Sequence, residues 1–328
     1  MWCCKWWKSL RTTAVKLYEI YIFEESFQGV QVAIASPRSL PNAKLLKGKV
    51  VVLDLAFAHS KPSGRYPSIT HKLIDHLGDR LALFLDHHDS EFHEEFKDKE
   101  RFVLASKAEH GACPEMIDVD LVERVGTIDS ILCHGDFDGL MSAAKWLLGG
   151  HEPYSGGDHD AWCVDTRLET PSTQGLLMDR ALRAHFKDAE VKSLVLKYLL
   201  SRATDQDLKT KLLRLGAEAK LLEEAADRLA KSYQRLSDTV SYIDTRSSYL
   251  NFDKTHLLLC GQRLSQVAVV RTEESITFAA PFNSGVNFLS LFQVSGGMPT
   301  VISLPPHRLR GALVLLGVKA SLAKSLVP

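Results

Sequence analysis

The chain has 328 residues, of which 45% are hydrophobic and 24% are charged, the balance of a globular protein. Its 40 basic and 40 acidic residues give a formal net charge of zero. This excludes a whole-protein attraction to nucleic-acid polymers or anionic membranes, although a local basic groove is compatible with it. The six cysteines form no C-x-x-C pair, which excludes a zinc knuckle and favours buried thiols in a reducing compartment.

The first residues read "MWCCKWWKSLRTT", with charges inside the apolar stretch and no cleavage site, so they do not fit a signal peptide. No apolar run approaches the length of a membrane span. We therefore expect a cytoplasmic protein without a membrane partner. We take residues 1–28 as an N-terminal extension.

An α/β domain is predicted over residues 29–178. Strands are expected at "GVQVAIASP", "GKVVVLDLAF", "LALFLDHH" and "DSILCHGDFDG", because short apolar runs bounded by Gly, Pro or polar residues are typical of buried strands. Helices are expected at "SITHKLIDHLGDR", "PEMIDVDLVERVG" and "LMSAAKWLLGG". This alternation predicts a parallel sheet with helical crossovers.

Residues 179–245 are rich in Leu, Ala, Lys, Glu and Arg and predict a helical linker that packs on one of the two domains. Residues 246–328 predict a small α+β domain. Its expected β-runs are "HLLLCGQ", "QVAVVRT", "SITFAAPF" and "MPTVISLP".

Four apolar runs of the first domain, all read as strands, end in acidic or imidazole residues. They end at Asp54, at Asp86, His87 and His88, at His134, Asp136 and Asp138, and at Asp165. One strand-end aspartate commonly caps the next turn, but four in one domain are unusual. Because ligands of open α/β sheets bind at the carboxyl ends of strands, these residues predict a metal site there.

The motif "HGDFDG" places Asp136 and Asp138 two residues apart. In an extended segment the pair would point the same way, and Gly139 would allow a tight turn into a helix that begins near Leu140. Such a pair can hold two neighbouring cations, for which a central strand-end carboxylate must form a bridge. Asp54 is the candidate for that bridge.

Together, "VVVLDLAF", "LDHHDSE" and "CHGDFDGLMSAA" resemble the DHH phosphoesterase superfamily, which contains single-strand exonucleases, oligonucleotide and cyclic-dinucleotide hydrolases, and manganese pyrophosphatases. The resemblance implies two divalent ions, one held by His134, Asp136 and Asp54 and the other by Asp138, Asp54, His87 and Asp165. It also implies that His88 faces the phosphate and that Asp86 orients the imidazoles. In the family the D-x-D motif comes first, whereas here it follows the other two, which a circular permutation would explain. Asp129, Asp158 and Asp160 are alternatives to Asp165.

The segment "VSGGMPTVISLP" resembles the glycine-rich substrate loop of the domain that accompanies DHH domains, with Gly296 and Gly297 as its glycines, although a Gly-Gly pair can also make a simple turn. Arg65, Arg167, Arg263 and His307 are further candidate phosphate contacts. The cluster of His71, Asp75 and His76 on one predicted helix is more typical of a solvated face.

We expect an enzyme, a two-metal phosphoesterase that hydrolyses phosphodiester or phosphoanhydride bonds of a short nucleotide or oligonucleotide held between the two domains. Oxygen and imidazole ligands without thiolate favour manganese, with magnesium as the other candidate. A nucleotide-sensing module that keeps the pocket without turnover is the alternative. A purely structural protein would have to bear the repulsion of converging carboxylates without cations. The substrate and the polarity of cleavage do not follow from the sequence. A homodimer is compatible with it.

Overall fold

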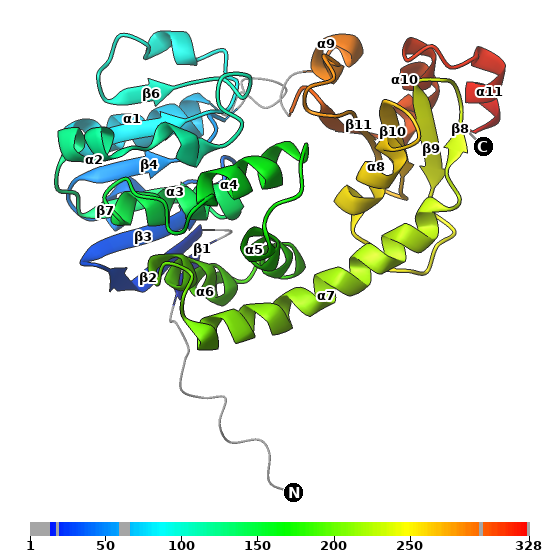
Figure 1. Cartoon of the computed structure of the whole chain (residues 1–328). Helices are drawn as coiled ribbons and strands as arrows, with labels where there is room; N and C mark the ends of the chain where they lie inside the picture. Colours follow the sequence, from blue (N-terminus) through cyan, green and yellow to red (C-terminus); the bar gives the residue numbers. More distant parts are fainter. Residues whose placement is uncertain (1–13, 18–19, 59–65, 295–297, 327–328) are drawn as a thin grey trace, which may run out of the picture. The chain divides into compact units, whose positions relative to one another are not determined.

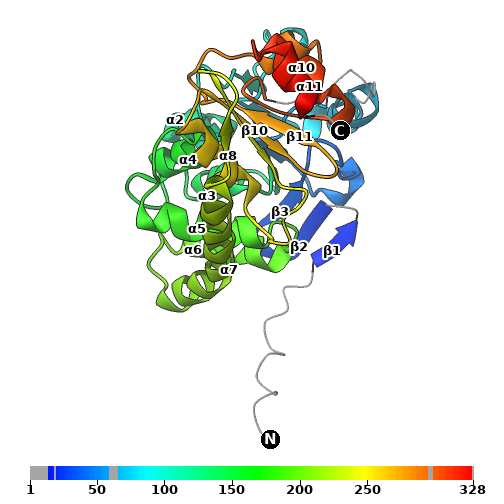
Figure 2. The same ribbon diagram turned by 90° about the vertical axis from the view of Figure 1, so that its right-hand side faces the viewer.

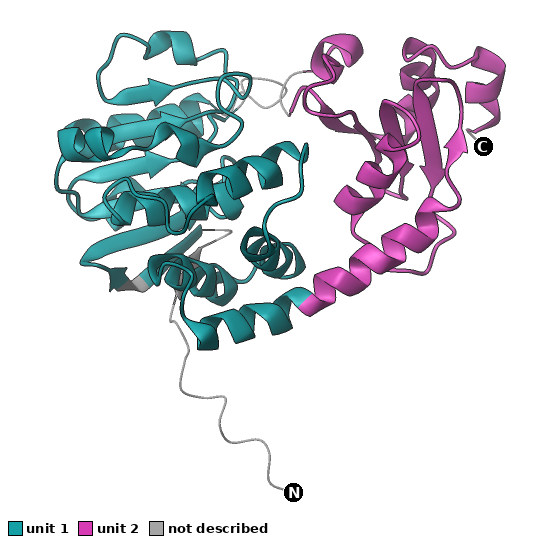
Figure 3. Cartoon of the chain, in the orientation of Figure 1, with its two compact units in different colours: residues 1–216 teal, residues 217–328 magenta. Residues whose placement is uncertain are grey.

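The structure, a computed structural model, describes residues 14–17, 20–58, 66–294 and 298–326. It divides into two compact units, residues 1–216 and residues 217–328 (Figure 3). The boundary lies inside the helix α7 (Gln206–Ala230), within the region that the sequence predicts as a helical linker. Each unit has its own sheet and its own core.

The first unit contains a seven-stranded sheet (Figure 1). Its order is β1 (Ala14–Leu17), β2 (Ile20–Phe27), β3 (Val30–Ala35), β7 (Ser130–His134), β4 (Val50–Leu53), β5 (Leu81–Asp86) and β6 (Phe102–Leu104). The five strands from β3 to β6 in this order are parallel, whereas β1 and β2 are antiparallel neighbours. β1 and β2 fall within the part of the chain that the sequence predicts as an extension.

Helices cover both faces of this sheet, because the central strands alternate apolar side chains between the two faces. Val32 and Ile34 of β3 face one core, and Ala33 and Ala35 face the other. The first core contains residues of α2 (Val119–Val125), α3 (Phe137–Leu147), α4 (Gly157–Thr166), α5 (Thr173–Ala184) and α6 (Ala189–Leu200). The second contains residues of α1 (Lys72–Leu77).

The second unit is built around a five-stranded sheet in the order β12 (Val301–Leu304), β11 (Ile276–Ala279), β10 (Val267–Arg271), β9 (Val240–Asp244) and β8 (Gln234–Arg235). One face carries α8 (Lys254–Gln262) and the end of α7. The other carries α9 (Phe288–Phe292), α10 (Leu309–Leu315) and α11 (Ala320–Ser325), of which α10 and α11 lie side by side in both views (Figures 1 and 2).

Two predicted strands are helices. The run "HLLLCGQ" forms α8, since the Asp253 side chain accepts the His256 N–H at 3.0 Å and starts the helix there. The run that ends at Asp165, "AWCVDTR", belongs to α4, in which Ala161 and Val164, three residues apart, both enter the core. A short apolar run does not distinguish a strand from a buried helix by its periodicity. No helix among the described residues is long and apolar enough to cross a membrane.

The junction of α2 and α3 yields a stability prediction. Gly149 and Gly150 both have positive φ, but only at Gly150 would an added Cβ meet backbone, 2.4 Å from the carbonyl carbon and oxygen of Asp118. We expect Gly149→Ala to lower the free energy of unfolding by about 1–2 kcal/mol through backbone strain. Gly150→Ala should cost about 2 kcal/mol more, because α2 must move. Urea unfolding of both variants measures the difference, and equal losses would contradict the close packing at Asp118.

Candidate metal centre

Three neighbouring parallel strands bring the predicted residues to one edge of the sheet. β4 lies between β7 and β5, and Leu53 is paired with Cys133 on one side and with Leu85 on the other. The residues that follow these positions therefore emerge together. Asp54 occupies the middle place, with His134 on one side and the Asp86–His88 segment on the other.

Asp54 is buried and has a strained backbone. Its φ of 54° lies in the left-handed region that a non-glycine residue seldom adopts. Its N–H donates to the Leu85 carbonyl at 2.9 Å, which holds that conformation. Both of its carboxylate oxygens are buried without a hydrogen-bond partner among the described residues. Strain and an orphaned buried carboxylate in one residue are typical of a functional position.

One candidate ligand group consists of Asp54, His134 and Asp136, whose ligand atoms all lie within 4.8 Å of one another. His134 Nδ1 is 2.6 Å from Asp136 Oδ2 and 3.8 Å from Asp54 Oδ2. Burial disfavours the charged imidazole, but the Asp136 carboxylate outweighs it and raises the pKa of His134 to about 9. Burial likewise disfavours the charged carboxylate of Asp136, but the nearby His134 outweighs the effect of burial and lowers the pKa of Asp136.

A second candidate group lies around His87. Its Nε2 is 3.3 Å from Asp54 Oδ1 and 3.3 Å from Asp138 Oδ2. The ligand atoms of His87, Asp138 and Asp165 all lie within 4.8 Å of one another. His87 Nδ1 is 2.9 Å from the carbonyl oxygen of His110. With the proton on Nδ1 donated to this carbonyl, Nε2 is left to bind a cation, as in many metal-bound histidines.

The charges of this group are balanced by protons in the metal-free protein. Burial opposes a charged imidazole, yet the adjacent carboxylates of Asp138 and Asp54 raise the pKa of His87 to about 11. The pKa of Asp54 is raised by burial and then by the Asp138 charge, and that of Asp138 by burial and then by Asp136. In the metal-free protein these protons thus supply positive charge that a bound divalent cation would replace.

The donor set fits a hard or borderline divalent ion. It contains carboxylate oxygens and imidazole nitrogens. Cys113 and Cys133 lie near the Asp54 carboxylate. Burial is the main cause that raises the pKa of both thiols, and the negative charge of Asp54 raises it further. They remain protonated and are unsuited to bind a metal.

Asp86 and His88 form a separate pair. Asp86 Oδ1 accepts a hydrogen bond from His88 Nδ1 at 2.8 Å. Burial opposes the charged imidazole of His88, but the Asp86 carboxylate outweighs burial and raises the pKa of His88. Burial also opposes the charged carboxylate of Asp86, but His88 outweighs burial and lowers the pKa of Asp86. Asp86 thus favours the cationic form of His88, whose side chain is 27% exposed and lies next to the candidate ligands.

Gly139 has a different role from the predicted one. Helix α3 begins at Phe137, with Asp136 as its N-cap, so Gly139 lies inside the first turn. A Cβ there would be 2.6 Å from the His134 carbonyl and 2.9 Å from Asp54 Oδ2. Glycine is needed for close approach to Asp54, not for a turn. Asp136 and Asp138 accordingly do not extend side by side but enter different ligand groups.

The structure brings Asp165 to the second group from helix α4 instead of from a strand end. Its alternatives are engaged elsewhere. Asp129 accepts the Lys49 N–H at 2.7 Å, Asp158 pairs with Lys145, and Asp160 accepts hydrogen bonds from Tyr154 and Ser172.

Lys107 is a charged residue of the site that the sequence analysis missed. It is buried and forms an ion pair with Asp165. Despite burial, which opposes its charge, Asp165 and Asp138 raise the pKa of Lys107 above its usual value. Lys107 follows β6 by three residues, so its position after a parallel strand is a signal, but the strand is too short to be recognised with ease.

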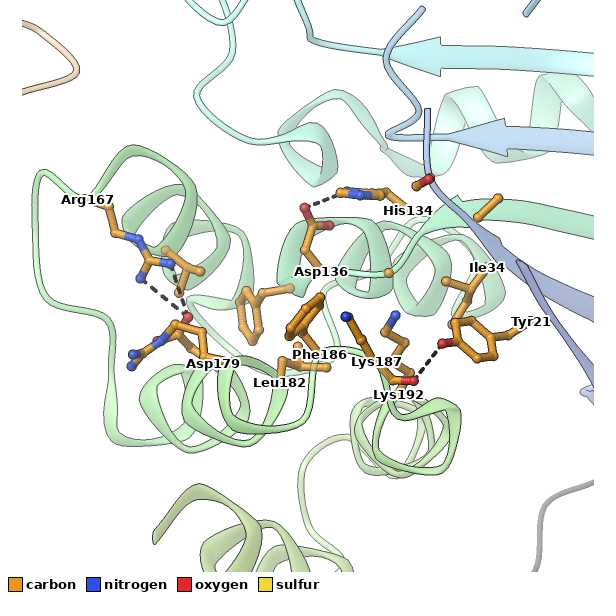
Figure 4. Close-up of a pocket in the computed structure, with 16 residues that line it drawn as sticks. Tyr21, Ile34, His134, Asp136, Arg167, Asp179, Leu182, Phe186, Lys187 and Lys192 are labelled. Atoms are coloured by element: carbon orange, nitrogen blue, oxygen red, sulfur yellow. Dashed lines mark hydrogen bonds and ion pairs between the residues drawn. The ribbon is translucent and has the colours of Figure 1, made fainter. Parts of the chain in front are cut away.

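The expected substrate contacts are only partly described. Arg65, Gly296 and Gly297 lie outside the described residues. Arg263 ends α8, and His307 lies in a short helical turn; both are exposed parts of the second unit. Arg167 lies in the first unit and bonds to Asp179 at 3.3 Å (Figure 4). His71 and Asp75 form an exposed pair at 2.8 Å, as expected for a solvated face.

No family model matches this sequence, and no curated protein matches it. Among solved structures it is similar to the exonuclease RecJ bound to manganese, at 13% identity and a TM-score of 0.39, over 83% of this chain and 75% of that one. It is also similar to the pGpG-specific phosphodiesterase PggH from Vibrio cholerae, at 10% identity and a TM-score of 0.39, over 85% and 99% of the two chains.

A third match is a putative family II inorganic pyrophosphatase from Methanococcus jannaschii, at 12% identity and a TM-score of 0.17, over 79% of this chain and 75% of that one. In its motifs, its mixed α/β sheet and the strand ends that carry its acidic and imidazole residues, the chain resembles the DHH phosphoesterase superfamily.

Proposed function

We propose that this protein is a metal-dependent phosphoesterase that hydrolyses phosphodiester or phosphoanhydride bonds of a short nucleotide or oligonucleotide, with two divalent ions, manganese in preference to magnesium. One observation carries the proposal. Asp54 is buried between two candidate ligand groups with both carboxylate oxygens unpartnered, and each oxygen faces one group. A carboxylate shared by two sites is what a pair of closely spaced ions needs.

Each residue then has a role that follows from its place. His134, Asp136 and Asp54 would hold one ion, and Asp54, His87, Asp138 and Asp165 the other. When bound, the ions supply positive charge to the phosphoryl oxygens and acidify water at neutral pH. The His110 carbonyl fixes the orientation of His87, and Lys107 fixes that of Asp165.

Asp86 and His88 provide the proton in this proposal. Water oxygen bonds to phosphorus, the bond from phosphorus to the leaving oxygen breaks, and the leaving oxygen takes a proton. Asp86 favours the cationic form of His88, which is partly exposed, so its Nε2 can donate that proton or a hydrogen bond. The proton lost by the attacking water passes to solvent.

The sheet order is compatible with the proposed circular permutation. β7, at whose end the motif "HGDFDG" begins, is the last strand of the first unit in sequence, yet it lies in the middle of the sheet beside β4. The motifs that follow β4, β5 and β7 therefore lie at the same edge of the sheet, whichever of them comes first in the chain.

A sensor that binds a nucleotide without turnover is the second candidate, because a ligand pocket alone would keep the same acidic residues. Incubation of the purified chain with manganese and a panel of pyrophosphate, linear dinucleotides, cyclic dinucleotides and short single strands distinguishes the two. Mass spectrometry should detect products from at least one nucleotide. Tight binding without any product would favour the sensor.

Asp138→Ala should lower the rate of hydrolysis by at least about a hundredfold, because it removes a ligand of the second ion and with it the stabilisation of the transferred phosphoryl group. The metal-free variant should melt at the same temperature as the wild type or higher, because burial and Asp136 both disfavour the ionised Asp138 carboxylate. Manganese should raise the melting temperature of the wild type more than that of the variant.

Asp120→Ala is the matched control, since Asp120 is an exposed aspartate of α2. It should keep wild-type activity and the full manganese-induced shift. Near wild-type hydrolysis by Asp138→Ala would overturn the assignment of Asp138 and the two-ion mechanism with it.

Manganese binding at pH 7 should release protons. The raised pKa values of His87, about 11, and His134, about 9, mean that both imidazoles carry a proton at pH 7, and a ligand nitrogen must lose it to bind the ion. Affinity should therefore rise with pH up to about 11, and most steeply below about 9, where both imidazoles still bind a competing proton. Isothermal titration calorimetry in buffers of different ionisation enthalpy measures the release, and a binding enthalpy independent of the buffer would contradict it.

A further inference from the structure

A cavity of about 320 Å³ adjoins the candidate metal centre within the first unit (Figure 4). His134, Gly135 and Asp136 form the wall that it shares with the metal centre. The opposite wall comes from α5 and from the segment that joins α5 to α6. The cavity therefore begins where the candidate ligands end.

Positive charge predominates on the wall of this cavity. Its cationic residues are Arg167, Arg183, Lys187 and Lys192, against the acidic residues Asp136 and Asp179. Both arginines bond to Asp179, at 3.3 Å and 2.9 Å, so that this aspartate balances part of their charge and fixes their positions. The two lysines add further positive charge next to the metal centre.

Lys192 packs against Gly135, between the candidate ligands His134 and Asp136. It is buried, and a Cβ added to Gly135 would be 2.7 Å from its Nζ. The ammonium group thus lies against the backbone that links His134 and Asp136, and a side chain at position 135 would displace it. Lys187 is exposed at the mouth of the same cavity, and in Figure 4 both lysine side chains extend toward Asp136.

The remaining wall is apolar and aromatic, with Tyr21, Ile34, Phe137, Leu182 and Phe186 among its residues. Phe186 is 61% exposed, which is unusual for so large an apolar side chain. Lys187 Nζ lies 5.3 Å from the centre of its ring. An exposed ring beside an ammonium group is suited to stacking on a base while the cation holds a phosphate.

We propose that this cavity binds one nucleoside monophosphate unit of the substrate, with the base on Phe186 and its phosphate on Lys187 and Lys192. This rests on the proposed function and narrows it. A volume near the lower end of the usual range for ligand pockets, about 300–1,000 Å³, suits one nucleotide and not a long strand. Inorganic pyrophosphate would leave the aromatic wall unused, so the preferred substrate carries a nucleoside next to the scissile bond.

Binding of adenosine 5′-monophosphate to the full chain with manganese, measured by calorimetry, tests the proposal. Phe186→Ala should weaken binding at least about tenfold, the loss of one stacked base. Lys187→Gln should weaken it as well, whereas inorganic phosphate should bind more weakly than the nucleotide to the wild type. Leu213→Ala is the matched control, since Leu213 is 57% exposed on α7 and does not line the cavity.

The proposal is overturned if Phe186→Ala and Lys187→Gln both bind the nucleotide like the wild type, or if phosphate binds as tightly as the nucleotide. Both substituted residues are exposed, so the variants should retain the wild-type melting temperature. A hydrolysis assay on a linear dinucleotide separates the two proposals. Absence of turnover of this dinucleotide and of every other nucleotide in the panel would overturn the proposed function, while the binding measurements would still decide the role of the cavity.

In the active enzyme, Phe186→Ala should raise KM for the dinucleotide at least about tenfold with a smaller effect on kcat, because stacking contributes to binding of the substrate before the reaction. A loss confined to kcat would contradict a binding role for this ring. Leu213→Ala should leave both constants unchanged.

Discussion

The site depends on one constraint, the parallel pairing of β7, β4 and β5 with their carboxyl ends at the same level. Leu53 is paired with both Cys133 and Leu85, so the next residue, Asp54, lies between His134 and Asp86. Its left-handed backbone then points a buried carboxylate between the two ligand groups. A shift of either neighbouring strand by one residue would turn its polar end to the opposite face.

Electrostatics follows from this geometry. Carboxylates that converge without water would repel one another, and the metal-free protein offsets this with protons on His87 and His134 and with the buried ammonium of Lys107. The same groups that bind cations therefore hold positive charge of their own when no cation is present. A chain that needed only a stable fold would gain more from apolar residues at these positions.

The sequence predicted the parts of the site that are local. Apolar strand runs that stop at Asp54, at the D-H-H triplet and at His134 are visible because strand and polar end are adjacent in the chain. The sequence did not predict that "AWCVDTR" is helical, although Asp165 still reaches the second group, because its short apolar run fits either structure. Phe186 was missed because only tertiary packing brings it to the site, and Lys107 was missed because the strand before it is so short.

The strand order also bears on how the chain folds. β3 and β4 follow one another in sequence, yet β7 separates them in the sheet, with Gln31 paired to Ser130. Pairing over so long a stretch of chain is slow, because a large loop must close before any contact forms. During synthesis Asp54 and the D-H-H triplet leave the ribosome before β7 exists. The mutual repulsion of the carboxylates arises only when this last strand inserts, so the availability of divalent cations in the cell would affect the yield of folded protein as well as its activity.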